Sequence, residues 1–283
     1  MTIEELVEAG KAKVLHKVEL DYEPSGDDGY PIVMVLDTET TGLDPLTAQV
    51  IELGYIMASY DPDKGCLRKM LSCYNGFSDP GYPISQEITA VTGLTDEHVE
   101  GKYFDIKRIN SDIDKANFIV AHNASFDRPF CELIPNAIFH TRPWACSFAD
   151  IDWKAEGISS SKLDYILMKL GYFFDAHRAI ADVEALIKAL QVSPCFQQLL
   201  HSKDTTFYRV SAIGSSFRKK DTLKNRGYQA LYKEGKFICW YTTKDSEEAA
   251  RLERDYLIDT IFCASAPIRA ITAMDKYSVR ENP

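Results

Sequence analysis

The sequence predicts an α/β fold with a β-hairpin built into its sheet, followed by a smaller α+β module. Residues 32–36 are an unbroken run of apolar, mostly β-branched residues, which is typical of a central strand that is buried on both faces. Two further strand patterns, 50–60 and 67–74, flank a turn-forming Asp-Pro-Asp-Lys-Gly segment. Strand and helix patterns then alternate, and the pattern restarts after Lys203. This order favours layers of helices packed on a mixed sheet.

The remaining elements follow from local signals along the chain. A short helix is expected at 2–9, a strand at 13–22 and a loop at 24–29. Helices that start at Ser or Thr cap candidates, or that have one apolar face, are expected at 85–91, 95–99, 126–133, 161–170, 180–190 and up to about Leu200. Strands are expected at 118–121, 206–212 and 237–241, and a last helix at 246–258.

The composition is that of an ordinary globular protein. Of the 283 residues, 45% are apolar and 26% are charged, so a sizeable core and more than one domain are possible. The seven cysteines are odd in number and form no CxxC pair, which indicates reduced thiols rather than a disulfide framework or a zinc site. The N-terminus lacks a secretory pattern and no apolar run reaches about 20 residues, so we expect a cytoplasmic protein without a membrane partner.

The net charge of −10 is distributed unevenly along the chain. Residues 1–203 hold 18 basic and 31 acidic residues, a net charge of −13, whereas residues 204–283 hold 14 and 11, a net charge of +3. Within 209–236 there are eight basic and two acidic residues. Such a contrast is compatible with a solvated basic face or with a surface that contacts a polyanion.

Carboxylates gather at the end of the predicted central strand. Asp37 and Glu39 are two residues apart, so their side chains project on the same side of a strand. Two carboxylates that lie close together repel each other unless a hard cation lies between them, and oxygen ligands favour Mg²⁺ or Mn²⁺. A D-x-E pair taken alone is equally compatible with an ordinary polar strand end.

Two later motifs add acidic residues near helix starts. Asp127 lies in the first turn of the helix expected at 126–133, where the helix dipole favours an anion. His177 and Asp182 are five residues apart and would point about 140° apart on one continuous helix. They can converge only if His177 lies on the loop that enters the helix. Each motif alone has a structural explanation, a helix-start carboxylate or a surface histidine.

The ordered combination of D-x-E, N-x-x-F-D and H-x-x-x-x-D resembles the DEDDh (DnaQ-like) 3′→5′ exonuclease family. This family includes the ε-type proofreading subunits of DNA polymerase III, ribonuclease T and oligoribonuclease. The resemblance covers about residues 31–192, with supporting matches at 39–43, 92–97 and 162–164. It implies an RNase H-like mixed five-stranded sheet flanked by helices, and two metal ions, Mg²⁺ or Mn²⁺.

By that resemblance each catalytic residue has a role. Asp37 bridges both ions, Glu39 and Asp182 complete the first, and Asp127 holds the second. His177 takes the proton from the attacking water, which suits an imidazole near neutral pH. The resemblance also implies that the terminal nucleotide contacts a further set of residues: Thr40, Gly42, Leu43, Thr92, Asn123 and Phe126. Thr92 stands where ε-type subunits often have His.

The C-terminal region interleaves basic and aromatic residues, among them Arg218, Lys219 and Lys220. This pattern favours contact with a nucleic-acid backbone combined with base stacking, although an appendage that packs on the nuclease or forms a dimer is equally compatible. We therefore divide the chain into an N-terminal extension (1–30), an exonuclease domain (31–203) and a basic, aromatic C-terminal domain (204–283).

The predicted function is hydrolysis of nucleic acid at a free 3′ end, with release of nucleoside 5′-monophosphates and DNA favoured over RNA. The alternatives are an RNA-trimming exoribonuclease or oligoribonuclease, and a non-catalytic nucleic-acid-binding or polymerase-docking subunit. A clamp-binding Q-L-x-L-F peptide is not evident. Proofreading, stand-alone DNA repair or turnover, a polymerase partner and a homodimer all stay open.

Overall fold

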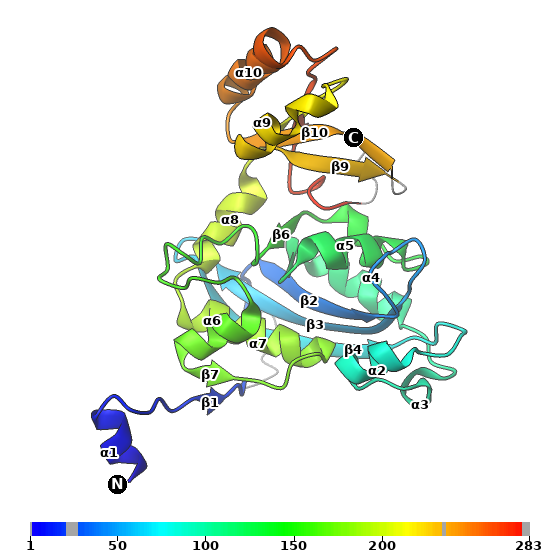
Figure 1. Cartoon of the computed structure of the whole chain (residues 1–283). Coiled ribbons are helices and arrows are strands. Elements are labelled where there is room, and N and C mark those ends of the chain that lie inside the picture. Colours follow the sequence, from blue (N-terminus) through cyan, green and yellow to red (C-terminus); the bar gives the residue numbers. More distant parts are fainter. Residues whose placement is uncertain (1, 21–27, 234–235, 279–283) are drawn as a thin grey trace. The chain divides into compact units, whose positions relative to one another are not determined.

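The computed structural model describes residues 2–20, 28–233 and 236–278 and divides the chain into two compact units (Figure 1). Of the described residues, 2–20, 28–203 and 277–278 belong to the first unit, and 204–233 and 236–276 belong to the second. None of the helices in the described ranges is long and apolar enough to cross a membrane.

A mixed five-stranded sheet forms the centre of the first unit. Its strands are β2 (Ile32–Thr40), β3 (Val50–Asp61), β4 (Cys66–Phe77), β5 (Phe118–Ala121) and β6 (Trp144–Cys146), and their order is β4-β3-β2-β5-β6. The β2–β3–β4 ladder is antiparallel, while β5 pairs parallel with both β2 and β6. This confirms the predicted RNase H-like α/β architecture with its built-in hairpin. The short strand β6 was not expected from the sequence.

Both faces of the sheet are covered by helices (Figure 1). Val33 and Val35 of β2 share a core with α6 (Leu163–Leu170), α7 (Ala179–Val192) and α8 (Phe196–Asp204). Met34 and Leu36 share the opposite core with α4 (Ile106–Lys115) and α5 (Ala124–Leu133). Burial on both faces explains why β2 is apolar without alternation.

Several local predictions need correction. Of the strand expected at 13–22, residues 21 and 22 lie outside the described residues, and within 13–20 the strand is only β1 (His16–Lys17), which pairs with β7 (Tyr172–Phe173). The helix expected from Ser161 starts at Leu163, because the chain at Lys162 is still extended. Helix α4 was missed, although its core residues follow a helical spacing. Residues 24–27 of the expected loop lie outside the described residues.

Short helices complete the first unit. Helix α1 (Ile3–Glu8) starts after Thr2, α2 (Gln86–Thr92) is capped by the Ser85 hydroxyl, and α3 (Asp96–Val99) follows Thr95. Leu94 and Val99 pack on Ile51 of β3. A single 3₁₀ turn at Phe139–Thr141 precedes β6.

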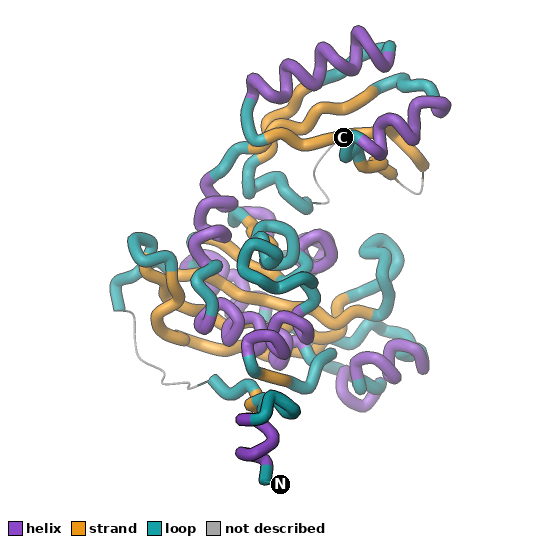
Figure 2. Tube along the Cα trace, turned by 60° about the vertical axis from the view of Figure 1, so that its left-hand side comes forward, coloured by secondary structure: helices purple, strands orange, loops and turns teal. Residues whose placement is uncertain are grey.

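The second unit is a separate antiparallel sheet with helices. Its strand order is β11 (Ile268–Ile271), β8 (Phe207–Ala212), β10 (Lys236–Lys244) and β9 (Gln229–Lys233). Helix α10 (Glu247–Tyr256), which a π turn extends over Leu257–Ile261, lies along one face of this sheet (Figure 2). The remaining helical elements are a 3₁₀ turn at Phe217–Lys219 and α9 (Lys220–Asn225).

Candidate active site

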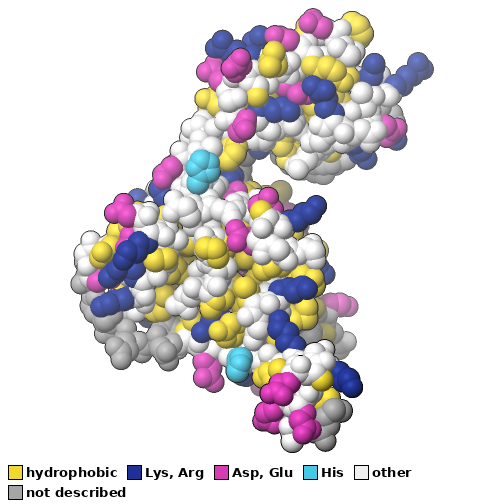
Figure 3. Space-filling model, turned by 90° about the vertical axis from the view of Figure 1, so that its left-hand side faces the viewer, with side chains coloured by type: hydrophobic (Ala, Val, Ile, Leu, Met, Phe, Trp, Pro, Cys, Tyr) yellow, Lys and Arg dark blue, Asp and Glu magenta, His cyan; other side chains and the backbone are white. Residues whose placement is uncertain are grey.

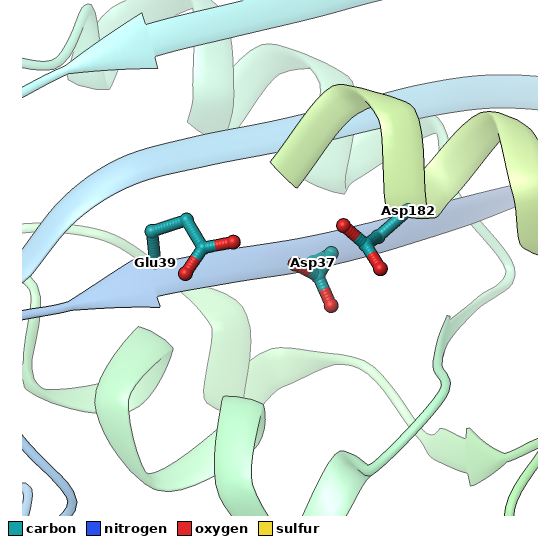
Figure 4. Close-up of side chains that lie close together, drawn as sticks. All are labelled: Asp37, Glu39 and Asp182. Atoms are coloured by element: carbon teal, nitrogen blue, oxygen red, sulfur yellow. The ribbon is translucent and has the colours of Figure 1, made fainter. Parts of the chain in front are cut away.

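Three carboxylates converge where β2 ends. Asp37 and Glu39 are odd-numbered, as are Val33 and Val35, and strand alternation therefore turns them toward the α7 face of the sheet. Asp182 projects toward them from α7 (Figure 4). One ligand oxygen from each of the three residues lies within 4.8 Å of the others.

Asp127 approaches the same strand end from the opposite face. It is the fourth residue of α5 and is buried. Its Oδ1 accepts hydrogen bonds from the Thr38 amide (3.1 Å) and the Thr38 hydroxyl (2.9 Å). Thr38 lies between Asp37 and Glu39, so these bonds fix Asp127 beside the three carboxylates without making it part of the 4.8 Å group.

His177 lies on the loop that enters α7. The helix starts at Ala179, and His177 has a left-handed φ of 69°, an unusual conformation for a non-glycine residue. Oδ2 of Asp182 accepts hydrogen bonds from the amides of His177 (2.9 Å) and Arg178 (3.2 Å). The loop therefore brings His177 to Asp182, although five residues along one helix would separate them.

The four acidic groups share an unfavourable electrostatic environment. Burial, followed by the charges of Asp127 and Asp182, raises the pKa of Asp37 well above its ordinary value. Burial and the charge of Asp182 raise the pKa of Glu39 to about 8, and burial raises the pKa of Asp127 to about 7. Burial also raises the pKa of Asp182. An all-oxygen, strongly acidic cluster of this kind fits Mg²⁺ or Mn²⁺, whose charge would favour the ionised carboxylates.

The expected nucleotide-binding residues lie in different surroundings. The Thr40 hydroxyl donates to the Gly42 carbonyl (2.6 Å), and Leu43 is 85% exposed. Asn123 directly precedes α5, and the ring of Phe126 packs on Phe130 with 5.0 Å between centroids. Thr40 ends the strand that carries Asp37 and Glu39, and Gly42 and Leu43 follow that strand. Asn123 and Phe126 lie at the start of the helix that carries Asp127.

Thr92 is buried, in contrast to Leu43. Its hydroxyl donates to the Ile88 carbonyl (3.0 Å) and accepts from the Leu94 amide (3.1 Å). These bonds hold the Thr92 side chain at the C-terminal end of α2. Its contact with a nucleotide stays a prediction.

Arg218, Lys219 and Lys220 belong to the second unit, at the 3₁₀ turn and the start of α9. Arg218 is exposed and the two lysines are half-buried. On the face of this unit that Figure 3 shows, basic and acidic side chains are interspersed.

Two residues near the site were not singled out from the sequence, Glu52 and Arg178. Glu52 lies on β3 directly opposite Glu39, is fully buried and forms an ion pair with Arg178. A single acidic residue within the apolar run 50–58 was the available signal.

Comparison with known families identifies this architecture. The family model of RNase T, described as exonuclease, matches residues 34–190, more than half of the chain and all four carboxylates. This chain belongs to the RNase T exonuclease family. The chain therefore carries the exonuclease domain of this family, in agreement with the family that the ordered motifs predicted.

Curated relatives match a part of the chain. DNA polymerase III PolC-type from Streptococcus pyogenes serotype M1 is 35% identical over 117 residues, and the enzyme of serotype M3 (strain ATCC BAA-595 / MGAS315) is 34% identical over the same length. Each match covers 40% of this chain and 8% of the relative. The chain thus spans a small part of these relatives' length.

Two solved structures share the fold at low identity. Exonuclease X in complex with 5′ overhanging duplex DNA is 22% identical with a TM-score of 0.43, and covers 59% of this chain and 97% of its own. The nuclease domain of 3′hExo bound to rAMP is 17% identical with a TM-score of 0.45, and covers 58% and 92%.

Proposed function

We propose that this exonuclease removes nucleotides one at a time from the 3′ end of DNA and releases nucleoside 5′-monophosphates. The observation that carries the proposal is the convergence of Asp37, Glu39 and Asp182 within 4.8 Å, next to the loop of His177. Hydrolysis of a phosphodiester needs a nucleophile near neutral pH and stabilisation of charge on two oxygens, and such a cluster can provide both with divalent ions.

We infer that the carboxylates hold two metal ions. Asp37, Glu39 and Asp182 would hold one, and Asp127 together with Asp37 would hold the second. When bound, Mg²⁺ or Mn²⁺ lowers the pKa of a bound water and stabilises charge at the attacking and leaving oxygens. The hydrogen bonds from Thr38 hold Asp127 in place for this task, and those from the loop amides hold Asp182.

His177 is the proposed general base. Its backbone amide is hydrogen-bonded to Asp182, so the imidazole extends from a restrained backbone position at the edge of the acidic cluster. Imidazole is the side chain whose ordinary pKa suits proton transfer near neutral pH. Leu43 and Phe126 present apolar groups beside the strand and helix ends, where a terminal base of any identity can pack.

The preference for DNA is supported by the relatives, whose name is DNA polymerase III. The test is a gel assay with 5′-labelled single-stranded DNA, duplex DNA with a 3′ overhang, and RNA, each with Mg²⁺ or Mn²⁺. We expect stepwise shortening of DNA from the 3′ end, faster than that of RNA, and none with Asp37→Ala. Faster shortening of RNA would make the enzyme an exoribonuclease, and internal cuts would contradict the exonuclease assignment.

The second unit is proposed to contact the nucleic-acid backbone. Each phosphate contacted on a single strand contributes about −0.7 to the slope of log K against log salt. The triple substitution of Arg218, Lys219 and Lys220 to Ala should therefore weaken binding of long single strands and make the salt slope shallower. Arg251→Ala with Arg254→Ala on α10 is the control, because these two arginines lie next to acidic partners within their helix. Equal losses in both variants would contradict a specific role of residues 218–220.

A further inference from the structure

A fifth carboxylate, which is fully buried, lies beside the active site. Glu52 is 0% exposed and pairs with Glu39 across the β2–β3 ladder. Its two oxygens accept hydrogen bonds from the guanidinium of Arg178, Nε to Oε2 and Nη2 to Oε1, both at 3.1 Å. Asn75 donates a further bond to Oε1 at 3.0 Å. Glu52 is therefore charge-compensated, unlike Asp37 and Glu39.

Arg178 links this carboxylate to the catalytic residues through two different groups. Its side chain binds Glu52 on the sheet, while its backbone amide donates to Oδ2 of Asp182. His177 precedes it in a left-handed conformation, and the His177 amide binds the same oxygen of Asp182. One residue thus anchors both the loop of His177 and the first turn of α7 to β3.

The absence of a side chain at Gly54 lets the start of α7 approach β3 closely. A Cβ at Gly54 would lie 2.7 Å from the amide nitrogen of Ile180 and 2.8 Å from the carbonyl carbon of Ala179. The start of α7 therefore packs directly on the backbone of β3, two residues from Glu52 and on the same face. Backbone contact fixes the distance of the helix from the sheet, and the ion pair restrains the entering loop at one place along the strand.

We propose that Glu52 and Arg178 are a positioning pair that holds His177 and Asp182 over Asp37 and Glu39, and that Glu52 is not a metal ligand. The proposal rests on the function proposed above, because it concerns the geometry of that site. A strained loop needs such a restraint, since an unfavourable φ persists where surrounding contacts enforce it. A misplacement of about 1 Å at a reacting group can cost about 10²-fold in rate.

The kinetic test compares Arg178→Gln, Glu52→Gln and Arg178→Lys with the control Arg68→Gln. Arg68 is a matched control because it also pairs with a mostly buried carboxylate, Asp28 (3.2 Å), beside Ser59 at the opposite end of β3. The substrate is a p-nitrophenyl ester of thymidine monophosphate, which requires the metal site alone. We expect Arg178→Gln and Glu52→Gln to lower kcat by about 10²-fold with little change in KM.

The rescue and the combined variant make this test specific for positioning. Arg178→Lys should recover part of kcat, since an ammonium keeps the charge and loses the two-pronged hydrogen bonding. The double variant Glu52→Gln/Arg178→Gln should lose no more kcat than either single variant, because both changes remove the same interaction. A kcat of Arg178→Gln equal to that of Arg68→Gln would overturn the proposal.

Metal binding separates positioning from ligation. Calorimetric titration with Mn²⁺ and no substrate should give the wild-type number of ions for Glu52→Gln and Arg178→Gln alike. Loss of one ion in Glu52→Gln but not in Arg178→Gln would make Glu52 a ligand and would overturn the proposal.

A readout without turnover separates this inference from the proposed function. Hydrogen exchange of the His177 and Arg178 amides should become faster in Arg178→Gln and stay at the wild-type rate in Arg68→Gln. If the wild type hydrolyses no substrate, the proposed function fails, while the exchange result still decides the positioning role. Unchanged exchange overturns that role. If Arg178→Gln does not fold, Arg178→Lys is measured in the same way, and unchanged kcat and exchange in it overturn the role.

Discussion

Both units hold carboxylates that are half-buried or buried, but they surround them differently. In the first unit Asp37, Glu39 and Asp182 face one another, and the pKa of each is raised. In the second unit Glu253 is 4% exposed. It accepts hydrogen bonds from Arg226 (2.7 Å) and from the Tyr228 hydroxyl (2.8 Å).

The pKa of Glu253 moves in the opposite direction. Burial acts to raise it, but the bonds from Arg226, Tyr228 and Lys244 outweigh burial and the pKa is lowered. A compensated carboxylate stabilises its fold, whereas a group of uncompensated ones costs stability until a cation binds. The pKa of Glu253 and the pKa values of the three clustered carboxylates thus shift in opposite directions.

The largest effect is expected from Asp37→Ala. It removes the ligand proposed to be shared by both ions, so hydrolysis of DNA and of the small ester should fall to background. The fold should survive, because the change also removes a desolvated charge from an acidic cluster. Activity assays with circular dichroism test this, and chelation with EDTA should reproduce the loss reversibly. Full activity in EDTA would contradict the two-metal assignment.

Glu253→Ala is the counterpart in the second unit. It leaves the partners of a buried carboxylate without their acceptor, which costs about 1–3 kcal/mol in the free energy of unfolding. Hydrolysis of the small ester should continue at the wild-type rate in the folded protein. A loss of ester hydrolysis without unfolding would show that the two kinds of buried acid are not separable as described.

On activity, His177→Ala should have the largest effect after Asp37→Ala. Removal of a general base lowers turnover by about 10²–10⁴-fold, and Mn²⁺ binding should be retained because His177 is not a proposed ligand. Steady-state kinetics and calorimetry test the two parts separately. If the variant lost the metal, the histidine would be a ligand rather than a base.

The pH dependence of stability should differ between the two kinds of carboxylate. The pKa of Glu39 is raised from 4.5 to about 8, so its contribution to stability is full below about pH 4.5 and is lost as the pH rises through about 8. The pKa of Glu253 is lowered, so its contribution is present above about pH 4.5 and is lost as the pH falls through its folded value.

Thermal unfolding in EDTA tests the predicted direction of this pH dependence. Between about pH 5 and pH 8 the metal-free first unit should lose stability, and Mn²⁺ should restore more stability at pH 8 than at pH 5. The second unit should show no corresponding loss. A metal-free protein that gains stability over this range would contradict the comparison.

The smallest effect is expected from Tyr228→Phe. It removes one of the hydrogen bonds to Glu253 and should cost about 1 kcal/mol in the free energy of unfolding, with kcat unchanged. Tyr241→Phe is the control, because its hydroxyl binds Gln229 in an exposed position. Denaturant unfolding of both variants measures the difference, and equal losses would mean that burial of the bond is unimportant.

The boundary between the two units does not divide the chain at a single position. Tyr277 and Ser278 follow the second unit in sequence but lie in the first. The Ser278 hydroxyl donates to Glu132 (2.7 Å), whose other oxygen pairs with buried Arg128 next to Asp127. Deletion of everything after Lys203 would remove these contacts. Substitutions within 218–220 are therefore the cleaner test of the second unit.

Much of the fold was determined by local sequence. The apolar run of β2, the hairpin that follows it, the Ser85 cap and the Gly171 end of α6 depend on neighbouring residues, so pattern and capping rules find them. The five catalytic candidates were also named from the sequence, because their spacing and order match one family. The sequence spacing itself did not give the positions of these residues relative to one another.

Tertiary structure alone decided how these elements meet. The pairing of Glu52 with Arg178 joins residues 126 positions apart, and the return of Tyr277 to the first unit joins it to Asp150 across 127. Short strands such as β1 and β6 likewise exist because a partner strand is present. Capping and periodicity arise within a few residues, whereas compensation of a buried charge depends on which distant side chain the fold brings to it.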